Sequence, residues 1–505
     1  MKKNLLRVLS SAFLLLTACG GEAVSSVEGP SSNQDNSSVA QTSSSNTQTG
    51  PIITEDVTIH LWSITGKNNQ EQLQSYVDAF MAKEPHVTVV NTIQTGMGYN
   101  ELKDATEKAF TAETHPDIVQ CYPDHVAEYL DYNKAVDLDP YINNPEYGWS
   151  TEEKNDYIES FLEEGTQYSV PGTYSVPYCK STELMFYNPV MLGIDLSQID
   201  ATINDGLPLN EDYFNNLTWE ELFNKFCPAI VTYNDSLPED KKILKSDQAH
   251  HGVFAYDSDD NLFITLAEQY GYDYTGIDPV TGKGQVLFNN DNMKNLMKTF
   301  HTAAEKGYII SKGSSENNYT NTYFTKQNTL FSVGSTGGVK YQYDASTMKD
   351  TRVARIPQAA GHAPKTISQG PSLTVLNHAD DTKGLRKLAS WLFYKTMTDS
   401  VNSLDWAVNS GYMGIRHSNY ENADYKEANN VDAQTEGSIE KLMARSANKA
   451  SEIVDELYTS PAFKGSSECR TQGAGLMTWA LTPASDMSKI DEMFADAERK
   501  AVLKL

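Results

Sequence analysis

Apolar and polar residues alternate along the first part of the chain in a strand–helix–strand pattern. Strand-like runs occur at 57–62, 87–93 and 116–120, and apolar positions at helical spacing predict a helix over 70–83. Strands that alternate with helices build a parallel sheet flanked by helices, and such sheets bind ligands at the carboxyl ends of their strands. Here those ends are expected at residues 62–67, 96–99 and 122–124.

The stretch 175–188 has no helical period and separates this first unit from a second, different one. Pro177 limits the backbone to extended geometry, and 184–187 is a short apolar and aromatic run typical of a buried strand. We interpret the stretch as a crossover from a first lobe to a second at the bottom of a cleft, with Ser181 facing the cleft. A strand between two helices of one domain fits these residues equally well.

Beyond Asn188 the pattern becomes mostly helical, with a capping box at 218–221 and helical spacing over 293–304. The Gly/Ser-rich segment 332–338 is interpreted as a flexible loop, either an anion-binding nest or a plain connector.

Strands return at 353–356 and 373–376, and helices come after them. We therefore expect the chain to return to the first sheet and then to cross into the second lobe once more. The predicted lobes are 53–181 with 334–376 for α/β lobe 1, and 182–333 with 377–505 for the mostly helical lobe 2.

The N-terminus has the features of an export signal. Lys2, Lys3 and Arg7 precede an apolar run over 5–16 that is too short to span a bilayer. The run ends in Leu16-Thr17-Ala18-Cys19, which resembles a bacterial lipobox and implies that Cys19 is diacylated and becomes the mature N-terminus. Residues 1–19 are thus the predicted signal peptide. Residues 20–52, rich in Ser, Asn and Thr, are predicted to be a flexible linker that holds the body at the extracytoplasmic face of the cell membrane.

Net charge and cysteine content narrow the functional class of the protein. The 505-residue chain has a formal net charge of −27, which disfavours sequence-independent binding to nucleic acid, although a local basic pocket remains possible. Cysteines 121, 179, 227 and 469 have no metal-ligand spacing and are predicted to be buried, small hydrophobic residues. The sequence leaves any disulfide pairing among them open.

Four short motifs carry a family resemblance from about Val57 to the C-terminus. They are Pro116-Asp117-Ile118-Val119, the stretch from Pro177 to Asn188, Trp219-Glu220-Glu221-Leu222, and Trp406 followed by Gly411-Tyr412. In this order behind a lipobox they resemble the extracellular solute-binding proteins of ABC importers, in the carbohydrate-binding family that includes the maltose-binding protein. The resemblance implies a periplasmic-binding-protein-like (type II) α/β fold, in which two hinged lobes close on one ligand in an interlobe cleft and a permease reads the closed form.

Within that family the chain looks most like the glycerol-3-phosphate-binding branch. The ligand residues of the branch match Tyr99, Ser181, Ser335, Gly370, Tyr412 and Arg470. One position departs: the branch has a Glu where this chain has Pro123 and then Asp124, so Asp124 is the candidate replacement.

The chemistry of these residues suits a ligand site independently of the resemblance. Arg470 can hold a phosphate through two parallel bonds, although a surface or interlobe ion pair is its alternative role. Trp62 and Trp406 offer flat faces for a carbon skeleton, and core packing explains Trp406 equally well.

The expected function is a lipid-anchored, monomeric solute-binding subunit of an ABC importer, with a carbohydrate or a polyol phosphate resembling glycerol 3-phosphate as ligand. A neutral mono- or oligosaccharide is the main alternative ligand. A secreted glycan-active enzyme, which needs a carboxylate pair that the sequence cannot place, and an adhesin or sensor on the same fold are the alternative classes. No cofactor, metal or catalytic residue is implied.

Overall fold

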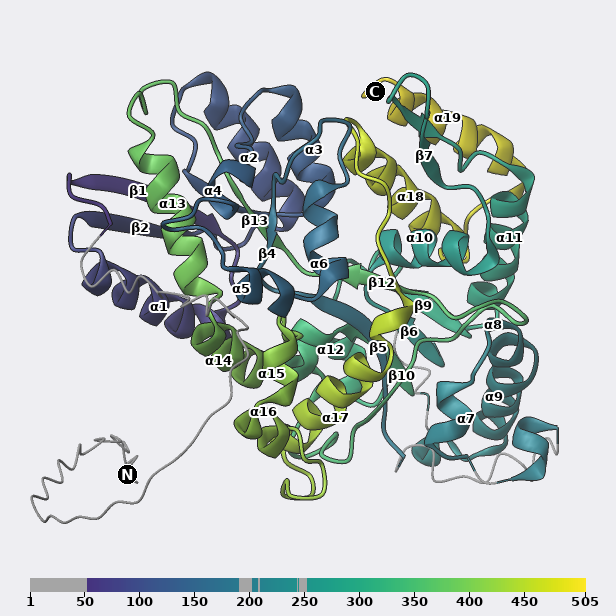
Figure 1. Ribbon diagram of the computed structural model, residues 1–505. Coiled ribbons are helices and arrows are strands. Elements are labelled where there is room, and N and C mark those ends of the chain that lie inside the picture. Colours follow the sequence, from purple (N-terminus) through teal and green to yellow (C-terminus); the bar gives the residue numbers. More distant parts are fainter. Residues whose placement is uncertain (1–51, 190–201, 208, 243, 245–251) are drawn as a thin grey trace, which may run out of the picture. The chain divides into compact units, whose positions relative to one another are not determined.

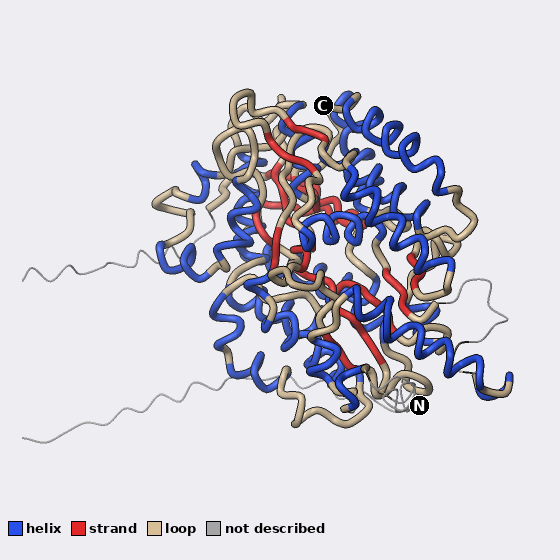
Figure 2. Tube along the Cα trace, turned by 90° about the vertical axis from the view of Figure 1, so that its right-hand side faces the viewer, coloured by secondary structure: helices blue, strands red, loops and turns tan. Residues whose placement is uncertain are grey.

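The computed structural model describes residues 52–189, 202–207, 209–242, 244 and 252–505, and residues 51–505 form one compact unit. Two mixed β-sheets organise this unit (Figure 1). Figure 2 shows the strands running through the interior with helices to either side. The predicted α/β class is therefore confirmed, while Cys19, the signal peptide and nearly all of the linker lie outside the described residues.

The first sheet has the strand order β2-β1-β3-β13-β4, with β1, β2 and β3 parallel and β13 antiparallel to β3. Neighbouring residues of β3 point to opposite faces: Ile118 packs with α1 and α13, and Val119 packs with α2 and α3. The bounds are β1 (Val57–Ser63), β2 (Val87–Ile93), β3 (Ile118–Cys121), β4 (Val176–Pro177), β13 (Ser372–Val375), α1 (Gln70–Lys83), α2 (Tyr99–Thr111), α3 (Pro123–Asp131) and α13 (Leu385–Met397).

The second sheet is built around β5 (Ser181–Tyr187), of which all seven residues are buried. Its order is β14-β12-β5-β10-β6-β9, and β11 also pairs with β5. The other strands are β6 (Phe254–Tyr256), β9 (Ile309–Ser311), β10 (Phe331–Ser335), β11 (Arg352–Ala354), β12 (Thr366–Gln369) and β14 (Leu457–Tyr458). Its larger helices are α9 (Cys227–Ser236), α10 (Asp259–Tyr270), α11 (Asp291–Glu305), α17 (Ile439–Glu452), α18 (Ser466–Ala480) and α19 (Ile490–Val502).

The remaining elements complete the described chain. They are α4 (Asp139–Ile142), α5 (Thr151–Asp156), α6 (Glu159–Glu163), α7 (Glu211–Asn215), α8 (Trp219–Glu221), α12 (Asn321–Thr325), α14 (Ser400–Ser410), α15 (His417–Glu421), α16 (Ala423–Ala428), the hairpin β7 (Thr275–Ile277) and β8 (Gly284–Val286), the π-helix η5 (Leu222–Phe226), and the 3₁₀ turns η1 (Lys67–Asn69), η2 (Glu164–Thr166), η4 (Ile203–Gly206), η6 (Glu239–Lys241), η7 (Thr336–Gln342), η8 (Val454–Glu456) and η9 (Met487–Lys489).

Several predicted elements are confirmed. The predicted helix 70–83 is α1, and the predicted strand 87–93 is β2. The stretch 175–188 does connect the two sheets, because β4 belongs to the first and β5 to the second. Cysteines 121, 179, 227 and 469 are all free and buried, as predicted.

The second region holds more than the predicted helices, because β5 pairs with strands from distant parts of the chain to form a sheet. One prediction about this region was wrong. The segment 332–338 is not a flexible loop: β10 runs between β5 and β6, and η7 comes directly after it. Small side chains are poor strand formers alone, but pairing on both sides overrides that preference.

The lobe boundaries remain a prediction, although several elements inside them lie elsewhere than expected, and two of these show why. The predicted lobe 1 includes residues 352–354, but β11 pairs with β5 in the second sheet. The predicted lobe 2 includes the helix that begins at Leu385, but its residues Trp391 and Phe393 belong to the core of the first sheet. In both cases the local pattern identifies the element but carries no information on which sheet it joins.

Among the described residues, no helix combines the length and the apolar character needed to cross a bilayer.

Candidate ligand-binding site

A cavity lies where the connections between the two sheets meet. It encloses about 40 Å³, room for roughly three water molecules. Its walls come from the end of β3 and the start of α3, the turn η2, the β4–β5 and β12–β13 connections, the hairpin strand β7, and the start of α18. The polar part of the lining includes Tyr122, Asp124, Glu164, Lys180, Gly370 and Arg470.

Arg470, on α18, is held by polar partners on α10. Its Nη1 donates to Asp260 Oδ2 at 2.7 Å and to Asn261 Oδ1 at 2.6 Å. Burial alone would lower the pKa of the Arg470 guanidinium, but Asp260 and Asp124 raise the pKa above its usual value. The predicted site residue is therefore at the cavity and is already engaged in an ion pair.

Asp124 lies in the first turn of α3, where Pro123 takes the first helical position. Its Oδ2 atom is buried and makes no hydrogen bond to any described residue. The nearest cation is Arg470 Nε, 4.0 Å away, which is too long for a hydrogen bond. This oxygen is thus an unsatisfied acceptor at the cavity wall, suited to a hydroxyl or amine donor.

Three tyrosines extend the site from Asp124 toward η7. The rings of Tyr99 and Tyr122 meet edge to face at 4.7 Å. Burial, together with the neighbouring Tyr412 and Tyr122 hydroxyls, raises the pKa of Tyr99. Burial also raises the pKa of Tyr412, so both hydroxyls stay protonated and able to donate. A side chain at Gly337 would come within 2.8 Å of the Tyr412 ring, so this position leaves room for the ring.

Gly370 is a position that only glycine can occupy. Its φ is +90°, and a Cβ there would lie 1.8 Å from the carbonyl oxygen of Cys179. The Gly370 carbonyl accepts a hydrogen bond from Lys180 Nζ at 3.3 Å. The close approach of 370 and 179 joins two of the connections between the sheets.

The remaining candidates lie away from the cavity lining. Ser181 is buried in β5 opposite Gln369. Ser335 Oγ accepts from Gly337 N at 3.2 Å and so caps η7. Trp406 is buried in the core of the first sheet, although it stacks on Tyr412 at 6.0 Å. Trp62 packs against the apolar cluster formed by α2, β3 and α3.

Four polar residues at the site were not among those predicted from the sequence: Glu164, Lys180, Asp260 and Asn261. Lys180 stood in the crossover stretch, but its charge gave no reason to expect burial. Glu164 and Asp260 lie in polar surroundings without a motif. A buried charged residue is recognisable only once its partner is placed beside it.

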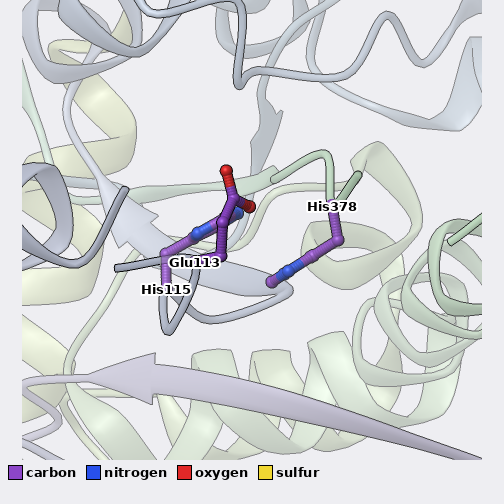
Figure 3. A group of neighbouring side chains, drawn as sticks. All are labelled: Glu113, His115 and His378. Carbon is purple, nitrogen blue, oxygen red and sulfur yellow. The ribbon is translucent and has the colours of Figure 1, made fainter. Parts of the chain in front are cut away.

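One group of side chains has a metal-ligand composition: Glu113, His115 and His378, with one potential ligand atom of each within 4.8 Å of the others (Figure 3). His115 Nδ1 is buried without a hydrogen-bond partner. The two imidazoles, however, stack face to face, with centroids 3.9 Å apart and planes 6° apart. Ring nitrogens bind metals in the plane of the ring, so parallel stacked rings do not converge on one ion. This arrangement does not fit a metal site.

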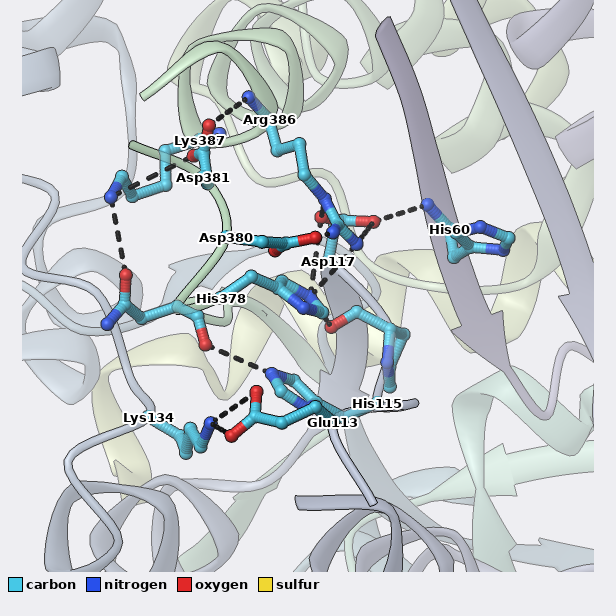
Figure 4. A network of polar contacts seen from close by, with 12 residues as sticks. His60, Glu113, His115, Asp117, Lys134, His378, Asp380, Asp381, Arg386 and Lys387 are labelled. Carbon is cyan, nitrogen blue, oxygen red and sulfur yellow. Dashed lines mark hydrogen bonds and ion pairs between the residues drawn. The ribbon is translucent and has the colours of Figure 1, made fainter. Parts of the chain in front are cut away.

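The surrounding contacts give these groups a structural role (Figure 4). Lys134 Nζ donates to both Glu113 oxygens, at 2.8 and 3.0 Å. Asp117, which is 1% exposed, accepts from Arg386 Nε at 2.6 Å and from the backbone N–H of His60 at 2.8 Å. The Lys134 bonds join the segments that come after α3 and α2, and the Asp117 bonds join α13 and β1 to the residue just before β3.

Two mixed sheets with a cavity at their connections define a periplasmic-binding-protein fold. The family model described as "Bacterial extracellular solute-binding protein" matches residues 75–433, which is most of the chain. The chain belongs to this family, whose members bind solutes outside the cytoplasm and are not enzymes. No curated protein matches the sequence.

Solved structures with this fold include three binding proteins of different ligands. UgpB from Mycobacterium tuberculosis, solved with glycerophosphocholine, has a TM-score of 0.64 and 18% identity over 89% of this chain and 98% of its own. Maltose-bound MalE3 from T. maritima gives 0.63 and 15% over 89% and 100%. The GacH receptor of Streptomyces glaucescens, solved with acarbose, gives 0.61 and 16% over 88% and 99%. At these identities the likeness is one of fold.

Proposed function

We propose that this protein is the solute-binding subunit of an ABC importer and that it captures a small, hydroxyl-rich ligand at the cavity between Asp124 and Arg470. The family supports the transport role, and the convergence of both sheets' connections on one polar cavity supports the place of binding. The complementary donors and acceptors there match the hydroxyl groups of a carbohydrate or polyol.

The ligand we favour is a neutral sugar or polyol. The resemblance to the glycerol-3-phosphate-binding branch points to a phosphate ester, and UgpB was solved with a phosphodiester. The observation against a phosphate is that Arg470 already donates to Asp260 and that the Asp124 carboxyl group faces the same guanidinium. A fully ionised phosphate group has no proton to donate to Asp124 and would lie beside two carboxyl groups, whereas a hydroxyl can accept from Arg470 and donate to Asp124.

Capture requires the walls of the cavity to separate and then close. The space open at the cavity, about 40 Å³, is small, so we expect the segments around Asp124 and those around Arg470 to move apart for entry. Contacts from both sides then favour the closed arrangement over the open one, and the permease recognises the closed form. A lipid on Cys19, joined through residues 20–52, would keep the body near that permease. Mass spectrometry of the N-terminal peptide tests the lipid, and Cys19→Ser is then expected to release the protein from the cell.

A thermal-shift screen tests the proposal, because a ligand that binds only the folded state raises the melting temperature. The panel is glycerol 3-phosphate, glycerophosphocholine, glycerol, and neutral mono- and oligosaccharides. We expect stabilisation by a neutral member, and its loss in Arg470→Ala but not in the control Arg499→Ala, which removes an exposed arginine. Stabilisation by the phosphate esters alone would reject the neutral ligand. A response of Arg470→Ala equal to that of the unchanged protein would reject the site.

A further inference from the structure

A buried ion pair forms part of the wall of the cavity. Lys180 Nζ lies 2.5 Å from Glu164 Oε2, and the two side chains are 1% and 3% exposed. Taking two charges out of water is costly, and charged residues are seldom fully buried unless they are paired. The pair therefore needs further contacts that fix its geometry, and the structure supplies them.

Lys180 contacts three separate connections between the sheets. It lies in the β4–β5 connection, and its Nζ donates to the carbonyl of Gly370 in the β12–β13 connection. Its own carbonyl accepts from Met413 N at 2.7 Å. Met413 belongs to the core of the second sheet, whereas Trp406, seven residues earlier, belongs to the core of the first, so the chain crosses there as well.

Glu164 links Lys180 to the edge of the second sheet. Its Oε1 accepts from Ser368 Oγ of β12 at 2.6 Å and from Thr459 Oγ1, just after β14, at 3.0 Å. Each oxygen of the carboxylate thus has at least one partner. The β12–β13 connection and the segment after β14 cannot shift without breaking a side-chain bond to the pair, and the segment at Met413 cannot shift without breaking its backbone bond to Lys180.

We propose that the Glu164–Lys180 pair positions the three connections and thereby sets the balance between the open and closed arrangements of the two sheets. The residues act as positioning residues, since they fix where Gly370 faces the cavity that Asp124 and Arg470 share. The inference rests on the proposed function for the act of capture, but it makes a claim about the protein without ligand.

The test is a distance measurement in the unliganded protein. Spin labels on Glu71→Cys in α1 and Glu492→Cys in α19, placed in a protein with Cys19→Ser, report the separation of helices on the first and second sheets. Both positions are exposed, and the four cysteines among the described residues are buried. The variant is the double substitution Glu164→Gln with Lys180→Met, which removes both charges together and so leaves no unpaired buried charge. The matched control is Lys383→Met with Glu55→Gln, an exposed ion pair whose residues come just before α13 and β1 and so lie on the side of the first sheet alone.

The double variant is expected to shift the distance distribution relative to both the unchanged protein and the control. The affinities for all ligands are expected to fall by the same factor, which is about tenfold if only a tenth of the molecules remain in the binding-competent arrangement. An unchanged distribution would overturn the inference, with or without a loss of affinity, because a loss alone would mean that the pair merely contacts the ligand. If no ligand of the panel binds, the proposed function is rejected, but the distance measurement still tests this inference.

A second variant guards against failure of the double variant to fold. Thr459→Val keeps both charges and the shape of the side chain but removes one bond to Glu164. It is expected to shift the distribution in the same direction by a smaller amount, and no shift in this folded variant would equally overturn the inference.

Discussion

Asp124 and Arg470 face each other across the candidate site, with 4.0 Å between Asp124 Oδ2 and Arg470 Nε, while Arg470 has a nearer partner in Asp260 at 2.7 Å. The cavity therefore offers an acceptor and a charge-matched donor side by side. The proposed preference for a neutral ligand rests on this relationship, which leads to a direct test of ligand charge.

Asp124→Asn separates a neutral from an anionic ligand. A hydroxyl loses its bond to an ionised acceptor, which is worth about 1.5–3 kcal/mol, so affinity for a neutral sugar should fall roughly 10- to 100-fold. A phosphate ester should instead bind more tightly, because a carboxyl group beside it is gone. Isothermal titration calorimetry measures both. Asp131→Asn, at the far end of α3, serves as the control, and tighter binding of the sugar by Asp124→Asn would contradict the neutral assignment.

Gly370→Ala is expected to destabilise the protein by several kcal/mol, because the new Cβ would overlap the Cys179 carbonyl at a backbone conformation that already disfavours alanine. The matched control is Gly361→Ala. That residue has a φ of +77° but no atom within 4 Å of the added Cβ, so it should lose only about 1 kcal/mol. Urea unfolding of both variants gives the comparison, and equal losses would mean that the contact with Cys179 is unimportant.

His125 should make stability fall in mild acid. Burial lowers its pKa from 6.5 to about 4 in the folded protein, so between these values only the unfolded chain takes up the proton. This contribution is complete above pH 6.5 and is lost as the pH falls toward 4, for a total of about 3 kcal/mol at 1.36 kcal/mol per unit. Unfolding free energies from pH 7.5 to 4 should therefore vary less in His125→Gln. The exposed control His417→Gln should keep the dependence of the unchanged protein.

Glu183 should act in the opposite direction. Burial raises the pKa of this β5 carboxyl from 4.5 to about 7, despite hydrogen bonds from Tyr256 and Asn261 that favour its ionised form. The folded state holds the proton longer than the unfolded state, so the contribution is complete below pH 4.5 and is lost as the pH rises through 7. Glu183→Gln should lose less stability than the unchanged protein between pH 5 and 8 in chemical unfolding. An identical slope would show that Glu183 ionises at its usual pH.

Local patterns predicted the elements of the first sheet because those elements carry their own signals. The helix 70–83 has a full apolar face, and the strands 57–63 and 87–93 are long enough to show their character. Strands β6 and β9 have three residues each and find partners that are distant in sequence, so no local period reveals them. Register and sheet membership depend on those distant partners.

The residues of the candidate site also divide into those that the sequence could predict and those that it could not. Resemblance brought Gly370 and Arg470, and a departure from it brought Asp124; the structure places these three at one cavity. Resemblance also brought Ser181, and aromatic character brought Trp406, but these two are buried in strand and core. Glu164 and Lys180 escaped notice because sequence gives no measure of burial for a charged residue. Their importance becomes evident only when three connections far apart in the chain meet at Lys180.

The four free cysteines have a practical consequence. Cysteines 121, 179, 227 and 469 are buried as free thiols, so no disulfide among them links one sheet to the other. Movement at the connections is then limited only by noncovalent contacts, and folding of the body requires no oxidant. A truncated protein that starts near Ile53 should therefore reach its native state in the reducing cytoplasm of an expression host, without passage through the secretory machinery.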